Sequence, residues 1–130
     1  MKLLGIDYGR KKIGLSISGG KLAEPYQVIR YANYEKMIAH IQRIVERLKI
    51  ERIVIGMSEN EMGEEIKKFG ESVKLSNMSI EVGFCDETLS SHDAIEMSVA
   101  GGMGRKKRKE MEDAFAASIM LQNYIDQSNG

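Results

Sequence analysis

The hydrophobic residues of this chain have the spacing of β-strands over the first thirty residues and then alternate between helical and strand spacing, and this order limits the folds that the chain can adopt. Residues 13–18 alternate branched aliphatic side chains with glycine or serine, which is the period of a β-strand. A short apolar run at residues 2–7 precedes them, and the polar segment 8–12 between the two has the composition of a turn. The pattern predicts a hairpin with one buried face. A third, edge strand is expected after Pro25, because proline is tolerated at the edge of a sheet.

At residue 37 the spacing becomes helical for the first time. The first helical segment has one apolar stripe, made of Met37, Ile38, Ile41, Ile44, Val45 and Leu48. Strands are predicted at 53–55, where every residue is apolar and both faces should be buried, and at 80–84. Further helices are predicted at 62–73, 90–99 and 111–125. Three strands followed by helix, strand, helix, strand, helix and helix predict an α/β fold, in which helices cover a mixed sheet.

The last predicted helix carries two features that matter for its packing. Ala116 and Ala117 are small enough to let the helix approach a sheet closely. Its apolar side is expected to comprise Met111, Phe115, Ser118, Ile119, Gln122 and Ile125.

Composition narrows the class of protein further. With 130 residues, 42% of them hydrophobic, the chain is expected to form a single domain over residues 1–130. The lone cysteine, Cys85, cannot form an internal disulfide, which favours a cytoplasmic protein. Nineteen basic and 19 acidic residues balance, yet positive charge is concentrated at 10–12 and 105–109. This distribution suits contact with phosphates at one site better than a protein that coats nucleic acid.

Acidic residues stand at the ends of separate predicted elements. Asp7 ends the first strand, Asp86 and Glu87 end another, and Asp113 lies in the final helix, one turn after Lys109. Carboxylates that come together repel one another unless a cation lies between them, and hard oxygen ligands favour Mg²⁺ or Mn²⁺. The alternative is that the strand-end acids cap turns and that Asp113 faces water.

Four segments, in order along the chain, resemble motifs of the YqgF/RuvX family of Holliday-junction-resolvase-like nucleases, which have an RNase H fold. The first is Gly5-Ile6-Asp7-Tyr8-Gly9 followed by 12–18, and the second is 54–57 with Asn60 and Gly63. The third is 86–91, and the fourth is 109–113 followed by 116–124, with Asp113, Ala116, Ala117, Leu121 and Gln122 in the family's spacing.

The resemblance implies an RNase H-like α/β domain, a five-stranded mixed sheet with helices on both faces. It implies that Asp7, Glu87 and Asp113 are catalytic and bind Mg²⁺ or Mn²⁺, with Asp86 supporting them. The implied reaction is metal-dependent hydrolysis of phosphodiester bonds, at the 5′ end of precursor 16S rRNA. The same site acting on branched DNA is the alternative, and that reaction favours a homodimer.

Basic residues next to these acids are the predicted contacts to nucleic acid: Arg10, Lys11, Lys12, Arg105, Lys106 and Lys109. Thr88 replaces the family's arginine, Gly19 stands where an aspartate is common, and Ser58 replaces a proline. These departures support a further alternative, a catalytically inactive RNase H-fold module that binds nucleic acid. No interaction with a membrane is expected.

Overall fold

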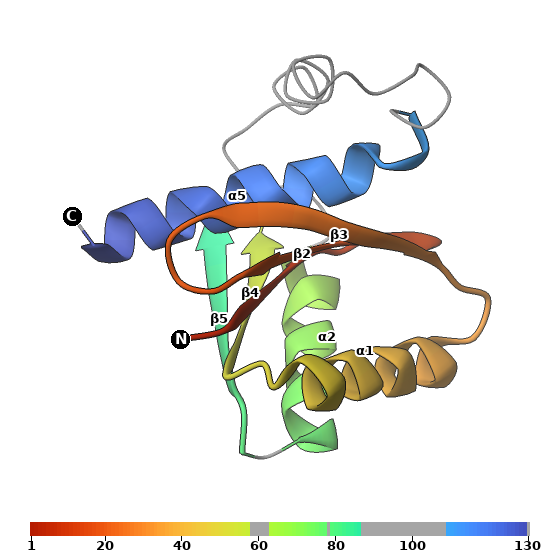
Figure 1. Ribbon diagram of the computed structural model, residues 1–130. Coiled ribbons are helices and arrows are strands. Elements are labelled where there is room, and N and C mark those ends of the chain that lie inside the picture. The colour runs from red at the N-terminus through yellow and green to blue at the C-terminus, as the bar shows by residue number, and fades with distance from the viewer. Residues whose placement is uncertain (58–62, 78, 87–108, 130) are drawn as a thin grey trace.

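The computed structural model describes residues 1–57, 63–77, 79–86 and 109–129. It contains a five-stranded sheet in the order β3-β2-β1-β4-β5 (Figure 1). The strands are β1 (Leu3–Asp7), β2 (Lys12–Ser18), β3 (Ala23–Arg30), β4 (Arg52–Met57) and β5 (Glu81–Asp86). β1, β2 and β3 pair antiparallel, whereas β1, β4 and β5 are parallel. The predicted mixed sheet is confirmed.

Helices cover both faces of this sheet, as predicted. The described helices are α1 (Tyr34–Leu48), α2 (Gly63–Ser76) and α5 (Glu112–Asn129). α1 and α2 lie on one face and α5 crosses the other (Figure 1). No helix in the described ranges is long and apolar enough to span a membrane. The helix predicted at 90–99 lies outside the described residues.

α1 begins and ends where local chemistry favours it. The Asn33 side chain accepts a hydrogen bond from the Lys36 N–H (2.9 Å), which caps the first turn. Lys49 ends the helix in the left-handed region, with φ of 56°. The predicted apolar stripe supplies the buried residues Met37, Ile41, Ile44 and Val45.

The sheet separates two hydrophobic cores. The α1/α2 side includes Leu4, Ile6, Ile13, Leu15, Ile53 and Ile55, and the α5 side includes Leu3, Val54, Cys85, Met120, Leu121 and Ile125. Successive β4 residues therefore point into opposite cores, because side chains alternate along a strand. The prediction that residues 53–55 are buried on both faces is confirmed.

The hairpin prediction was wrong about the second face of β2. Gly14, Ser16 and Ser18 are buried as well, against α5 rather than in solvent. Their small size lets the helix backbone come close, and the Ser16 hydroxyl donates to the Ala117 carbonyl (2.9 Å). Small polar residues on an alternating strand therefore marked a close helix contact.

The third strand begins at Ala23, before Pro25 rather than after it. β3 is an edge strand of the described sheet, where a missing N–H need not break a ladder. Pro25 pairs with Ser16, next to a shift of register between Leu15 and Ser16. β3 therefore has one extra residue, Tyr26, at this point, and the bulge accommodates the proline.

The buried side of α5 also differs from the prediction. Ala114, Ala117 and Leu121 are fully buried, whereas Ile119 and Gln122 are partly exposed. The helix lies so close to the sheet that alanines rather than isoleucine fill the contact. Phe115, Ser118 and Ile125 are buried as predicted, so periodicity located only part of this face.

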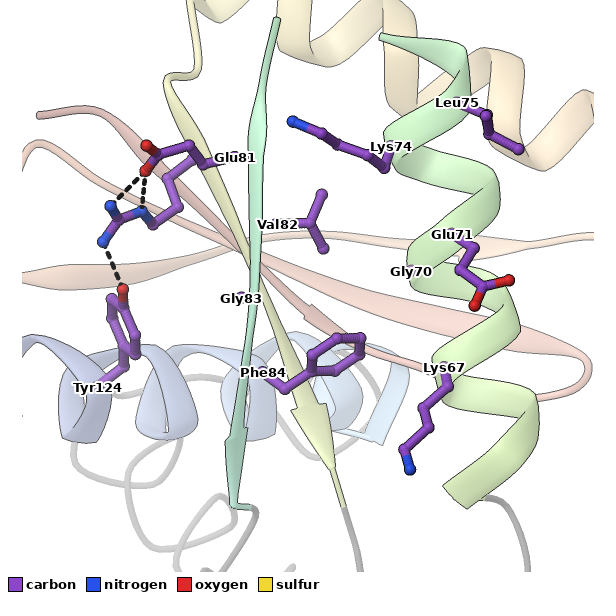
Figure 2. A pocket seen from close by; sticks show the side chains of 11 residues that line it. Lys67, Gly70, Glu71, Lys74, Leu75, Glu81, Val82, Gly83, Phe84 and Tyr124 are labelled. Carbon is purple, nitrogen blue, oxygen red and sulfur yellow. Dashed lines mark hydrogen bonds and ion pairs between the residues drawn. The ribbon is translucent and has the colours of Figure 1, made fainter. Parts of the chain in front are cut away.

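At the other edge of the described sheet, β5 leaves Phe84 41% exposed. Its ring lies in a hollow of about 930 Å³ between α2 and β5, beside Val82 (Figure 2). A Cβ on Gly70 would be 2.7 Å from this ring, so the absence of a side chain there lets the ring lie against α2.

Candidate active site

Asp7 and Asp86, two of the predicted acidic residues, lie at the same end of the sheet because their strands run in the same direction. β1, β4 and β5 are parallel, so their carboxyl ends meet at one edge. Asp7 is the last residue of β1, and Asp86, the last of β5, pairs with Met57. Glu87 directly follows β5 in the sequence and lies outside the described residues.

α5 brings Asp113 to the same edge. Asp113 lies in the first turn of α5, and its carbonyl oxygen would be 2.0 Å from a Cβ built on Gly14. Gly14 is the cross-strand partner of Asp7 in the β1–β2 ladder. A glycine at this position therefore allows the start of the helix to rest beside the end of β1.

Asp7 and Asp113 also lie on the same side of the sheet. Asp7 alternates in phase with Leu3 and Gly5, which both face α5. The Asp113 carboxylate forms an ion pair with the Lys12 ammonium (2.9 Å), and their side chains are 29% and 40% exposed. Asp113 therefore does not simply face water.

Contacts along α5 keep Asp113 in place. Leu121 packs against Gly5, and Ala117 accepts the Ser16 hydrogen bond. The Gln122 amide bridges the β2–β3 turn, accepting from the Ala23 N–H (2.9 Å) and donating to the Lys21 carbonyl (3.0 Å). The residues of the fourth motif thus either carry the site or hold the helix that carries it.

The far end of α5 is tied to the parallel strands. Arg52, the first residue of β4, donates to the Tyr124 hydroxyl (2.6 Å) and to the Glu81 carboxylate (Figure 2). The hydrogen bonds from Arg52 hold the pKa of Glu81 below its ordinary value. This network joins α5, β4 and β5 at the end of the sheet opposite the acids.

The turn after Asp7 is held by aromatic residues. The Tyr31 hydroxyl donates to the Gly9 carbonyl (2.6 Å), and the Tyr8 ring lies 4.6 Å from that of Phe69, centre to centre. Burial raises the pKa of both tyrosines, so both stay protonated at neutral pH. These contacts position the backbone that carries Arg10.

The predicted nucleic-acid contacts fall into three groups. Arg10 forms a two-point ion pair with Glu65 on α2 (3.0 and 3.1 Å), and Lys12 pairs with Asp113. Lys11 and Lys109 are exposed. Arg105 and Lys106 lie outside the described residues.

Sequence reasoning missed the β2 residues that hold α5, and with it Asp113, against the sheet. It assigned Lys12 to nucleic acid, but the ion pair with Asp113 makes Lys12 part of the acidic site. It also gave no role to Ser16 and Gly14, which form the contact with α5. The available signal was the alternation of glycine and serine with large aliphatic residues in β2.

The donor set fits a hard divalent cation. Asp7 and Asp113 offer carboxylate oxygens from two elements on one face, which suits Mg²⁺ or Mn²⁺. Within the described ranges, His, Cys, Asp and Glu side chains nowhere gather in a group of three or more that could hold a metal. The third predicted ligand, Glu87, is outside those ranges, and so is Glu59, a further acidic residue that follows β4 in the sequence.

Two solved structures with a similar fold are resolvases. *Thermus thermophilus* RuvC in complex with a Holliday junction substrate superimposes with a TM-score of 0.65 at 16% identity, covering 100% of this chain and 98% of that one. The fowlpox virus resolvase with Holliday junction DNA gives a TM-score of 0.66 at 11% identity, covering 100% of both chains. The fold is therefore that of the RNase H-like resolvases.

Sequence relatives narrow this class to one family. A family model described as "RuvX: Holliday junction resolvase" matches residues 1–127. Proteins of *Heliobacterium modesticaldum* and *Caldanaerobacter subterraneus* subsp. *tengcongensis*, each named "Putative pre-16S rRNA nuclease", are both 35% identical to this chain. The alignments cover 97% of this chain and 89% and 96% of the relatives. The chain belongs to the RuvX family.

Proposed function

We propose that this protein is a cytoplasmic, metal-dependent nuclease that hydrolyses phosphodiester bonds in structured RNA, at the 5′ end of precursor 16S rRNA. The observation that carries the proposal is the contact between α5 and Gly14, which places Asp113 beside the end of β1 where Asp7 stands. Relatives that match nearly the full chain are named for this substrate.

Each acidic residue has a role in this proposal. Asp7 and Asp113, together with Glu87, would hold Mg²⁺ or Mn²⁺, and Asp86 would support them. When bound, the ion supplies a Lewis acid that stabilises developing charge on the phosphate oxygens. Lys12 holds the Asp113 carboxylate at this edge through its ion pair.

The neighbouring cations would hold the substrate. Lys11 in the turn after β1 and Lys109 just before α5 are exposed at the two segments that bring Asp7 and Asp113 together. Arg105 and Lys106 extend the same basic run in the sequence. Contacts of this kind neutralise phosphates and position the backbone without reading bases.

Branched DNA is the second candidate substrate for the same site. It is favoured by the resolvases of the same fold that are bound to Holliday junctions. Backbone contacts do not distinguish the two nucleic acids, so the substrate must be tested directly. Cutting both strands of a junction symmetrically would require a homodimer.

The deciding experiment incubates the purified protein with a precursor 16S rRNA fragment or a four-way DNA junction, in Mg²⁺, Mn²⁺ or chelator. Cleavage of the RNA that needs a divalent ion is expected. Asp113→Asn should lower its rate by at least about 100-fold, because a metal ligand is lost. Asp126→Asn is the matched control, because Asp126 is an exposed residue near the far end of α5.

The proposal is overturned if the RNA stays intact with both metals, or if Asp113→Asn cleaves as fast as Asp126→Asn. Calorimetry with Mn²⁺ then separates an inactive module from a nuclease with another substrate. Binding that Asp7→Asn greatly weakens would indicate a metal site, whereas binding that is unchanged in the variant would support the inactive module.

A further inference from the structure

Outside the acidic site, positive charge gathers on the outer side of α1 and the neighbouring edge strand β3. Two hollows of about 320 and 480 Å³ share His40 and Arg43 in their walls. We call the surface that they form the basic groove, defined by Arg30, Lys36, His40, Arg43 and Arg47. Glu46 is the acidic residue in its lining.

The charge of this region departs from that of the whole chain. Residues 29–49 carry five arginines and lysines (Arg30, Lys36, Arg43, Arg47 and Lys49) against two glutamates (Glu35 and Glu46), although the chain has no net charge. Such a local excess creates a positive potential over one surface. An excess of charged residues on a helix usually marks only its solvent-exposed face. It therefore matters whether these cations form ion pairs with acidic residues.

The cations of the groove lack acidic partners in the described part of the chain. The ion pairs found there are Arg10–Glu65, Lys12–Asp113 and Arg52–Glu81, none of which includes a groove residue. Burial, followed by the charges of Arg43 and Arg47, lowers the pKa of His40, so both arginines act on a side chain in the wall of the groove. An anion would relieve this repulsion.

The basic groove begins next to the candidate active site. Arg30 pairs with Lys12 in the β2–β3 ladder, and the Tyr31 N–H donates to the Lys11 carbonyl (3.0 Å). Lys11 lies in the turn that follows Asp7, and Lys12 is the first residue of β2. From Lys36 to Arg47 the groove then follows α1 away from this edge for about 16 Å, at 1.5 Å per residue.

We propose that the basic groove binds the sugar-phosphate backbone of the nucleic acid that the active site cleaves, at positions away from the scissile bond. This inference rests on the proposed function. One strand of a duplex has a phosphate about every 3.4 Å along its axis and winds around that axis, so a groove about 16 Å long faces only some of the roughly five phosphates within its length. Its arginines and lysines hold the duplex while the acidic site acts on the bond near the β1–β2 turn.

The test compares two triple variants that lose the same charge. Arg30→Gln/Lys36→Gln/Arg43→Gln removes three exposed cations of the groove. The control, Lys2→Gln/Lys21→Gln/Lys67→Gln, removes three exposed cations elsewhere: Lys2 and Lys21 lie at the opposite end of the sheet, and Lys67 is on α2. Binding of a duplex RNA and of a four-way DNA junction is measured by fluorescence anisotropy over a series of salt concentrations, alongside cleavage kinetics.

For wild type and control, the plot of log Kd against log salt should have the same slope. In the groove variant the slope should be smaller by about two, because each phosphate contact contributes roughly 0.7–0.9 to it. KM should rise at least tenfold, with kcat within about twofold. If the slope and KM change more for one nucleic acid than for the other, that nucleic acid, RNA or DNA, is the one whose backbone the groove binds.

Equal slopes for the two triple variants on both nucleic acids would overturn the inference, even if the protein cleaves RNA as proposed. Salt-dependent binding that is lost only in the groove variant, from a protein that does not cleave, would support the groove and overturn the proposed function. Circular dichroism and thermal melting of both variants confirm that they fold.

Discussion

At Gly14 the backbone of α5 lies directly on the sheet, so a single hydrogen in place of a side chain decides where Asp113 stands. A Cβ there would be 2.0 Å from the Asp113 carbonyl oxygen and 2.8 Å from the Ala114 nitrogen. These are backbone atoms, which cannot rotate away. Gly5 on the neighbouring strand β1 leaves room in the same way, because a Cβ there would be 2.4 Å from the Ser16 hydroxyl oxygen.

Gly14→Ala should therefore lower the free energy of unfolding by about 1–3 kcal/mol, the usual cost of overpacking a core. It should also reduce cleavage by more than the loss of folded protein explains, because the first turn of α5 is pushed off the sheet. Urea denaturation and rate measurements at saturating metal check both effects. Gly19→Ala is the control, since a Cβ on Gly19 has nothing within 4 Å. A Gly14→Ala protein as stable and active as the control would contradict this account.

At the scale of elements, α5 is positioned by side-chain contacts distributed along its length. Lys12 binds its first turn, Ser16 its middle, and the β2–β3 turn and Arg52 its far half. The sequence predicted that such a helix exists and that it contains small residues for a close approach. It predicted only part of the buried face, because alanines such as Ala114 and Ala117 carry no strong hydrophobic signal.

Gln122→Ala tests one of these anchors. The substitution leaves the Ala23 N–H and the Lys21 carbonyl without their partner, and both lie on the β2–β3 turn. The free energy of unfolding should fall by about 1–2 kcal/mol, a typical cost for partly buried hydrogen bonds. Gln127→Ala, at an exposed position of the same helix, should change stability by less than about 0.5 kcal/mol. Thermal or urea unfolding of both variants gives the comparison, and equal losses would show that the Gln122 bridge does not hold α5.

For the whole molecule, periodicity predicted a mixed sheet, and the resemblance added that the sheet has five strands with helices on both faces. The ion pairs between elements could not be predicted. Lys12 and Arg10 belong to the same basic run, yet one pairs with an aspartate of α5 and the other with a glutamate of α2. Pairing across elements far apart in sequence depends on the final packing, which periodicity does not contain. The same limit hid the basic groove, whose residues come from both β3 and α1.

The uneven charge of the folded molecule has a consequence at acidic pH. Burial, together with Arg43 and Arg47, lowers the pKa of His40 from its ordinary value of 6.5, so the unfolded chain binds a proton on this residue more readily than the folded chain. The free energy of unfolding should accordingly fall as the pH is lowered through 6.5, until the folded histidine is protonated as well.

Arg43→Gln removes one of the two nearby positive charges and leaves burial in place, so the pKa of His40 should rise toward 6.5 without reaching it. The histidine proton resonances followed by NMR against pH measure this shift, and a His40→Asn variant assigns the signal, because the chain contains a second histidine. Lys2→Gln, at the start of the chain, should leave the titration unchanged. If Arg43→Gln gave the wild-type pKa, the positive potential attributed to the basic groove would be too weak to act on a group in its own wall, and too weak to attract a phosphate.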